Sequence, residues 1–103
     1  MSSNVFVKSG YVRDLLAPTT AATLTGNWMY KDAPNTGIQV VATAAATVVF
    51  DVSNDGVNAI ATALGTVTLA GAGSDGFVTN APWKYVRARV TANSGTVNVT
   101  ICS

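Results

Sequence analysis

Apolar and polar residues alternate along several short segments of this chain. Between residues 85 and 91, every second residue is apolar. One face of this segment carries Val86, Ala88 and Val90, and the other carries Tyr85, Arg87 and Arg89. A repeat of two residues is the period of a β-strand that buries one face, so the pattern predicts a strand with its valines in a core.

Similar apolar runs recur between residues that favour turns. We expect strands at residues 5–7, 11–12, 24–30, 38–42, 47–52, 65–70 and 96–101. Two of the connections carry strong turn signals: Ser53–Gly56 ends in Asp-Gly, and Gly71–Gly76 contains three glycines. The second connection is predicted to be a hairpin loop, because a phosphate-binding loop would need a Lys-Ser/Thr pair and a following helix.

The last two predicted strands are expected to pair as a hairpin. They are separated by Asn93–Gly95, and a three-residue loop that ends in glycine is a common hairpin connection. Val97, Val99 and Ile101 would then form a second apolar row beside the row in residues 86–90.

The pattern as a whole predicts an all-β fold. Seven or eight short strands separated by Gly, Asn and Asp turns are typical of an antiparallel β-sandwich or jelly roll, here a single domain spanning residues 1–103. The chain has no Glu and is rich in Val and Thr, so we expect less than about 10% helix. The segment Asp14–Thr20 could hold one helical turn, which Pro18 would limit.

The same alternation predicts which side chains are buried. The expected core residues come from three strands; they are Val48, Phe50, Val52, Val86, Val90, Val97 and Val99.

Low charge narrows the range of partners. Charged residues make up 11% of the chain and the net charge is +1, against about 25% charged residues in a typical soluble domain. We therefore expect no binding to nucleic acid or to a membrane surface. Because little charge keeps copies of the chain apart, self-association is expected.

Two uncharged stretches reach the length of a membrane span, at residues 33–50 and 56–74. Both are rich in Thr, Gly and Ala, so neither is expected to be a transmembrane helix. The first residues lack the basic start and apolar run of a signal peptide, so no secretion signal is expected. The single cysteine, Cys102, excludes an intrachain disulfide, and we expect it to be incidental.

The residue types argue against an enzyme. The chain has no His, so it cannot form a Ser-His-Asp or Cys-His arrangement. A glycosidase-type carboxylate pair would require the fold to bring two of the five isolated aspartates together. A calcium site around Asp51 and Asp55 is an alternative, but Asp55 is better explained by a turn. We expect no catalytic residues, no metal and no cofactor.

A basic and aromatic segment remains as the candidate interaction site. Trp83, Tyr85, Arg87 and Arg89 lie close together in the sequence, and the last three share the face of their strand that points away from the predicted core. Two arginines are too few for a nucleic-acid surface, whereas Arg and aromatic residues are common in protein interfaces. These four residues are therefore the predicted protein-interface residues.

Residues 37–101 also resemble a known group of proteins. The turn Asp51–Gly56 resembles a V-x-V-S-x-D-G pattern, and Pro82–Val90 resembles a P-W-K-Y-V-R-A-x-V strand. Both patterns occur in small structural proteins encoded by tailed bacteriophages and prophages. Where that pattern often carries an exposed Trp after the turn, this chain has Val57–Ala59, which weakens a sugar-stacking surface.

The resemblance implies a virion component without enzymatic activity. Its most specific implication is a capsid decoration or cement protein on the capsid exterior, bound to the major capsid protein and often trimeric. One alternative is a tail, baseplate or receptor-binding module for host glycans, with an aromatic platform formed by Trp28 or Tyr30 with Tyr11. Another is a secreted carbohydrate-binding module, which the expected lack of a signal peptide disfavours.

Overall fold

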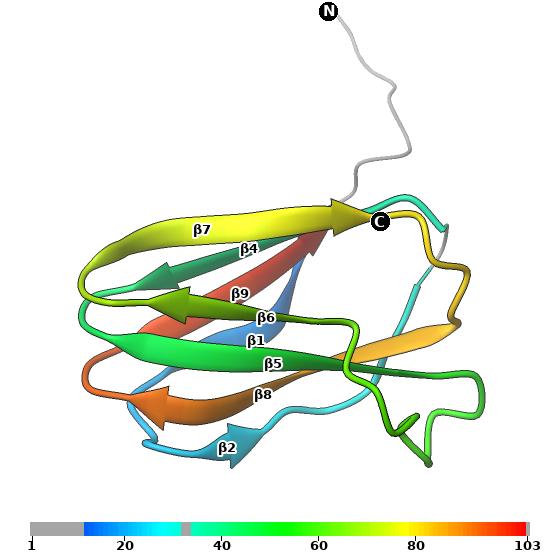
Figure 1. Ribbon diagram of the computed structural model, residues 1–103, viewed down its shortest axis with the longest axis horizontal. Coiled ribbons are helices and arrows are strands. Elements are labelled where there is room, and N and C mark those ends of the chain that lie inside the picture. Colours follow the sequence, from blue (N-terminus) through cyan, green and yellow to red (C-terminus); the bar gives the residue numbers. More distant parts are fainter. Residues whose placement is uncertain (1–11, 32–33, 103) are drawn as a thin grey trace, which may run out of the picture.

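The chain folds into two antiparallel β-sheets that face each other across an apolar core (Figure 1). The computed structural model describes residues 12–31 and 34–102, and it contains no helix within them. The strands are β1 (Val12–Thr19), β2 (Leu24–Thr25), β3 (Met29–Tyr30), β4 (Thr36–Ala42), β5 (Ala46–Ser53), β6 (Gly65–Leu69), β7 (Gly73–Thr79), β8 (Tyr85–Asn93) and β9 (Val97–Cys102). The predicted all-β sandwich is confirmed, while the predicted strand at residues 5–7 and Tyr11 lie outside the described residues.

The strand order explains how the two sheets are joined. Sheet A has the order β1-β9-β4-β7, and sheet B has the order β2-β8-β5-β6, with β3 also paired to β8. Strands that follow one another in the chain occupy the same position in the order of the two sheets. The corresponding pairs are β1 and β2, β9 and β8, β4 and β5, and β7 and β6. This arrangement is that of a jelly roll, in which the chain repeatedly crosses from one sheet to the other.

The predicted C-terminal hairpin is therefore wrong. β8 and β9 belong to different sheets, and the turn that joins them crosses the sandwich. Their apolar rows face each other across the core instead of lying side by side. Two neighbouring crossings support each other through backbone hydrogen bonds, from Ser94 N to Ala45 O (2.9 Å) and from Thr43 N to Thr96 O (3.0 Å).

The hairpin loop predicted at Gly71–Gly76 is also wrong. β7 begins at Gly73 and pairs with β4 over seven residues, whereas β6 pairs with β5. The connection after Leu69 thus crosses from sheet B to sheet A. Glycine is required within β7, because a Cβ on Gly76 would lie 2.0 Å from the carbonyl oxygen of Ile38.

The helical turn considered at Asp14–Thr20 is a strand instead. β1 runs from Val12 to Thr19 at the edge of sheet A, with two register shifts in its pairing to β9. An edge strand tolerates Pro18 because one side of its backbone needs no partner. The region 24–30 forms two short strands, β2 and β3, instead of one.

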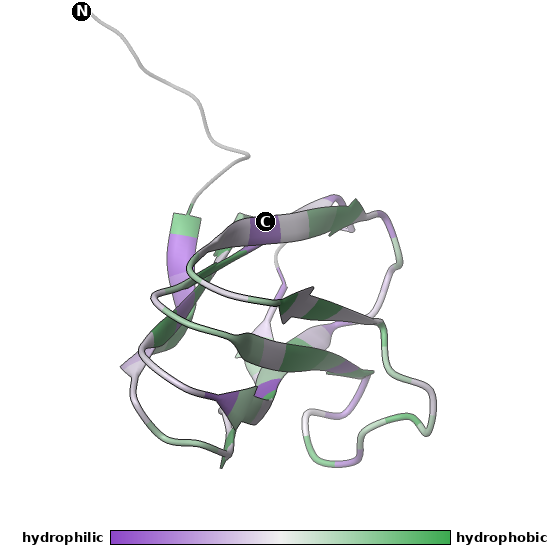
Figure 2. Cartoon of the chain, turned by 60° about the vertical axis from the view of Figure 1, so that its left-hand side comes forward, coloured by the Kyte–Doolittle hydropathy of each residue, from purple (hydrophilic) through white to green (hydrophobic). Residues whose placement is uncertain are grey.

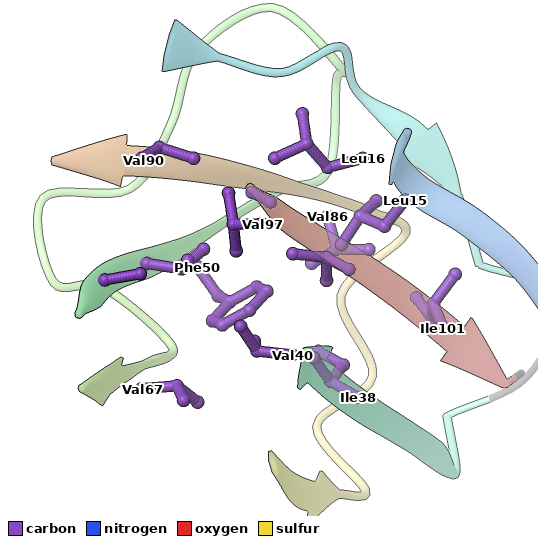
Figure 3. Close-up of a cluster of buried hydrophobic side chains, with 14 of the residues drawn as sticks. Leu15, Leu16, Ile38, Val40, Phe50, Val67, Val86, Val90, Val97 and Ile101 are labelled. Carbon is purple, nitrogen blue, oxygen red and sulfur yellow. The ribbon is translucent and has the colours of Figure 1, made fainter. Parts of the chain in front are cut away.

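All seven predicted core residues are buried, each 0–1% exposed. Apolar side chains from both sheets meet between the layers (Figure 3), and along the strands apolar and polar residues alternate (Figure 2). Phe50 lies at the centre, and the centroid of its ring is 5.4 Å from that of Phe77 in an edge-to-face arrangement. Because full burial of one such side chain stabilises a fold by about 1.5–3 kcal/mol, this core is what holds the two sheets together.

Candidate interaction surfaces

The four predicted interface residues lie on or next to β8, but in different surroundings. Trp83 is half-buried and packs against the core. Tyr85, Arg87 and Arg89 point to the outer face of sheet B, because the residues between them are buried in the core. The strand and its two faces are thus as the sequence predicted.

Both arginines bind one carboxylate of their own chain. Asp51, on the neighbouring strand β5, is 4% exposed. Its Oδ2 accepts hydrogen bonds from Arg87 Nε (3.1 Å) and Arg89 Nε (3.0 Å), and its Oδ1 accepts one from Arg89 Nη2 (3.2 Å). We call these three residues the Asp51 cluster. They form one charge-assisted network on the outer face of sheet B, in which the carboxylate is buried and the side chains of Arg87 and Arg89 are 23% and 38% exposed.

The electrostatics of the cluster follow from these bonds. The hydrogen bond from Arg89 lowers the pKa of Asp51, burial opposes this, and the bond from Arg87 lowers it further. In return, the bond to Asp51 raises the pKa of Arg89. The carboxylate is therefore ionised at neutral pH, and the cluster carries a net charge of +1.

Trp28 covers part of the cluster. The guanidinium carbon of Arg87 lies 4.5 Å from the centre of the Trp28 ring, a cation–π contact. Trp28 lies between β2 and β3, where Gly26 donates its N–H to Ala88 O (2.8 Å). A Cβ on Gly26 would also lie 2.8 Å from that oxygen, so only glycine allows this close approach.

Tyr30 and Tyr85 form an aromatic pair at the end of the same face. Their rings are 5.5 Å apart and nearly perpendicular, and Tyr30 is 50% exposed. Tyr85 also packs against the turn at Gly56, which has a φ of 70° as the predicted Asp-Gly turn requires. Of the aromatic platform considered from the sequence, Trp28 covers the cluster, Tyr30 is exposed, and Tyr11 lies outside the described residues.

Asp55 stabilises that turn and does not join Asp51 in a shared site. Its Oδ1 accepts hydrogen bonds from the backbone N–H groups of Val57 and Asn58 and from the Ser53 hydroxyl. These bonds, first that from Asn58, hold the pKa of Asp55 well below its usual range. Within residues 12–31 and 34–102, no three His, Cys, Asp or Glu side chains are grouped as a metal site would require.

The outer face of sheet A is different in character. It holds an open depression of about 410 Å³ in which none of the lining residues is charged. The lining residues are Val12, Gly37, Ile38, Gln39, Gly76, Phe77, Val78, Thr100 and Cys102. Gly37 and Gly76 create the hollow because neither has a side chain, and Val78, at 83% exposed, projects beside it. We call this feature the sheet A depression.

Sequence reasoning missed the sheet A depression and the cover over the Asp51 cluster. A signal for the depression exists in the sequence, since glycines inside strands often mark a close backbone approach or a missing side chain. The two glycines can be assigned to one hollow only when β4 and β7 are known to be neighbours, with Gly37 opposite Val78 and Gly76 opposite Gln39.

A buried lysine also escaped the sequence reasoning. Lys31 is 3% exposed and donates from Nζ to Ala81 O (2.8 Å), and burial lowers its pKa. It ties the end of β3 to the segment that precedes Trp83.

In the part of the chain that the structure describes, no helix is long and apolar enough to cross a membrane.

Comparison with known proteins identifies a relative in fold only. No protein-family model and no curated protein sequence matches the chain. Its structure is similar to the crystal structure of the SPBc2 prophage-derived protein YomS, with a TM-score of 0.70 and 12% sequence identity. The match covers 95% of this chain and 96% of YomS. The whole sandwich is thus a fold that also occurs in a prophage-derived protein.

Proposed function

We propose that this chain is a non-enzymatic structural protein of a tailed-bacteriophage virion. Within the virion we propose a capsid decoration or cement protein, bound to the major capsid protein on the outside of the head as a homo-oligomer, with a trimer as the expected form. The observation that carries the proposal is the shared fold with the prophage-derived YomS over nearly the full length of both chains.

The surfaces are compatible with a binding role. The outer face of sheet A is a broad strand surface with exposed Val12, Val41 and Val78. Exposed apolar groups that gather on one face are typical of a protein contact surface. A cement protein needs such a surface, because it stabilises a shell by adding contacts between subunits.

The test is co-sedimentation of the purified protein with heads assembled without it. The proposal predicts saturable binding to the heads and heads that resist heat or low salt better once the protein is bound. A protein that does not bind the heads, in conditions where it remains folded by circular dichroism, overturns the decoration role.

A receptor-binding role in the tail is the second candidate. It is favoured by one observation, the exposed Tyr30 beside Tyr85, because paired aromatic rings can stack on sugars. Binding to immobilised host glycans, lost in Tyr30→Ser and absent on heads, would support this role in place of capsid decoration.

We also propose that the protein needs neither metal nor cofactor. Each described aspartate already accepts a hydrogen bond within the chain: Asp14 from Asn98, Asp51 from the two arginines, Asp55 from its own turn and Asp75 from Gly76. A melting temperature unchanged by EDTA is the expected result, and a fall that calcium reverses would contradict it.

A further inference from the structure

We propose that copies of this chain associate by inserting Tyr30 of one copy into the sheet A depression of the next. The inference names the contact surface for the self-association in the proposed function and rests on that part alone, not on attachment to a head.

The sheet A depression has the shape and chemistry of a receptacle for one large apolar side chain. Its volume of about 410 Å³ lies at the small end of the range of roughly 300–1,000 Å³ for small-molecule sites. Its apolar walls would leave a charged or strongly polar group without partners. A ring with one polar tip suits it, because the hydroxyl can reach the rim residues Gln39 or Thr100 while the ring fills the hollow.

Tyr30 is the side chain of this protein that best fits the depression. It is 50% exposed, whereas Trp28 and Trp83 are partly buried by their own chain. It is also held in place before binding, because its ring contacts Tyr85 edge-on and its carbonyl accepts a hydrogen bond from Arg13 Nη1 (3.3 Å). A rigid aromatic anchor loses little conformational freedom on binding, which favours association.

The charges around the two surfaces are of opposite sign. Next to Tyr30 lie Arg13, bonded to its carbonyl, and the exposed Lys84, which directly precedes Tyr85. Beside the depression, the exposed Asp14 is the strand partner of the rim residue Thr100, and the lining residues themselves are uncharged. Opposite charges at the rim orient two surfaces as they approach. A second copy is therefore the favoured occupant.

The two surfaces are different patches of one molecule, which determines the type of assembly. Tyr30 belongs to the edge of sheet B, and the depression belongs to the outer face of sheet A. A contact between different patches is heterologous, and it either closes into a ring or continues as a filament. A closed three-membered ring is the form that agrees with the trimer in the proposed function.

Cys102 provides a direct probe of the depression. It is the one cysteine of the chain and one of the lining residues. We would measure the rate of its reaction with a thiol reagent, Ellman's reagent, as the protein concentration rises, with analytical ultracentrifugation on the same samples. The inference predicts that the reaction slows at least about fivefold as the oligomer forms, because an inserted ring covers the thiol.

Two variants test the two halves of the contact. Tyr30→Ser removes the inserted ring, and Gly37→Val fills the depression. The second should fold normally, because a Cβ on Gly37 would meet its nearest atom, the Cβ of Cys102, at 3.9 Å. Each variant should raise the dissociation constant at least about tenfold. Gly71→Val is the matched control, since a Cβ there meets nothing within 4 Å and should leave association unchanged.

A mixture of the two variants sharpens the test. Gly37→Val keeps its Tyr30, and Tyr30→Ser keeps its depression, so one contact can form between unlike copies. The mixture should give dimers at concentrations where each variant alone is monomeric. If Tyr30→Ser does not fold, Gly37→Val and the Cys102 rate still decide the question.

Three results would overturn the inference. One is a wild-type protein that stays monomeric at high concentration. Another is an oligomer in which Cys102 reacts at the monomer rate and Gly37→Val has no effect, which would leave self-association intact but place it elsewhere. A third is protection of Cys102 only in the presence of heads, which would make a capsid subunit the occupant.

Discussion

The two outer faces of this sandwich use the same strand pattern for different purposes. On sheet B, the outward side chains at the centre are charged: both arginines bind Asp51, and Trp28 covers Arg87. On sheet A, the outward side chains around the depression are uncharged and open to solvent. The arginines, the most conspicuous polar residues of the sequence, thus bind within their own chain, whereas the outer face of sheet A keeps uncharged side chains exposed.

The inner and outer faces of β5 give the first test of this comparison. Phe50 and Asp51 are adjacent, and both are buried, one in the apolar core and one under the arginines. Phe50→Ala should lower the free energy of unfolding by about 3–5 kcal/mol, because it removes a central ring and leaves a cavity. Urea denaturation followed by circular dichroism measures it. A loss below about 1 kcal/mol would mean that the core is not centred on this ring.

The double variant Arg87→Ala/Arg89→Ala tests whether the arginines on the outer face of sheet B stabilise their own chain. It leaves the Asp51 carboxylate without its partners, and because the arginines are partly exposed the loss should be about 1–3 kcal/mol at neutral pH. Exposed arginines that served only to contact another protein would cost almost nothing. As a control, replacing Asp51 together with both arginines by apolar residues should recover much of the loss, because no buried charge remains. Unfolding of the double variant at the wild-type urea midpoint would contradict the structural role.

The pH dependence of stability in the wild type and in Arg87→Ala/Arg89→Ala tests whether Asp51 is the group that the arginines stabilise. In the wild type the arginines lower the pKa of Asp51, so its stabilising contribution is present above the ordinary carboxyl pKa, about 4, and is lost as pH falls through the lowered value. In Arg87→Ala/Arg89→Ala only burial acts on Asp51 and raises its pKa. The deficit relative to wild type should therefore shrink as pH falls from 7 to about 4. A deficit that is constant over this range would show that Asp51 is not the group left unpaired.

Trp28 is expected to have an intermediate effect. Trp28→Ala removes the ring over Arg87 and should cost about 1–2 kcal/mol, within the range for a partly desolvated cation–π pair. Trp28→Phe keeps an aromatic face and should cost less. Equal losses for the two substitutions, measured by thermal unfolding, would mean that an aromatic face over Arg87 does not stabilise the fold.

The outer face of sheet A should show the smallest change in stability. Val78 is 83% exposed, so Val78→Thr should alter the free energy of unfolding by no more than about 0.5 kcal/mol. Because Val78 lines the depression, the same variant should still weaken self-association. Val57→Thr, at the similarly exposed turn of sheet B, is the control that should change neither quantity. An unchanged association constant for Val78→Thr would argue against the sheet A face as a contact surface.

The sequence predicted which side chains of a strand are buried, but not which strands are neighbours. Alternation assigned Phe50 and Val97 to the core because it reports only the two faces of a strand. It could not reveal that β8 and β9 lie in opposite sheets, since a short glycine turn serves a hairpin and a crossing equally well. For the same reason the Asp51 cluster was not predicted, because Asp51 is separated by 36 and 38 residues from the arginines it binds.

Two of the predicted interface residues, Arg87 and Arg89, have a role within their own chain that the sequence did not reveal. The sequence placed Tyr85, Arg87 and Arg89 together on an outer face, and the structure does so as well. What the sequence could not show is that one buried carboxylate already binds both guanidinium groups. A contact with another protein through Arg87 or Arg89 remains a prediction, and it would have to act in addition to this intrachain role.

We propose that this chain is a virion component that makes its contacts through sheet A and keeps the Asp51 cluster for its own stability. A cryo-electron microscopy map of the intact particle tests it most directly. The account predicts the chain on the outside of the head, with Val78 and the sheet A depression covered by a neighbour and the Asp51 cluster bound only within its own chain. A chain at the tail tip, or arginines that reach across to a neighbour while sheet A stays bare, would contradict it.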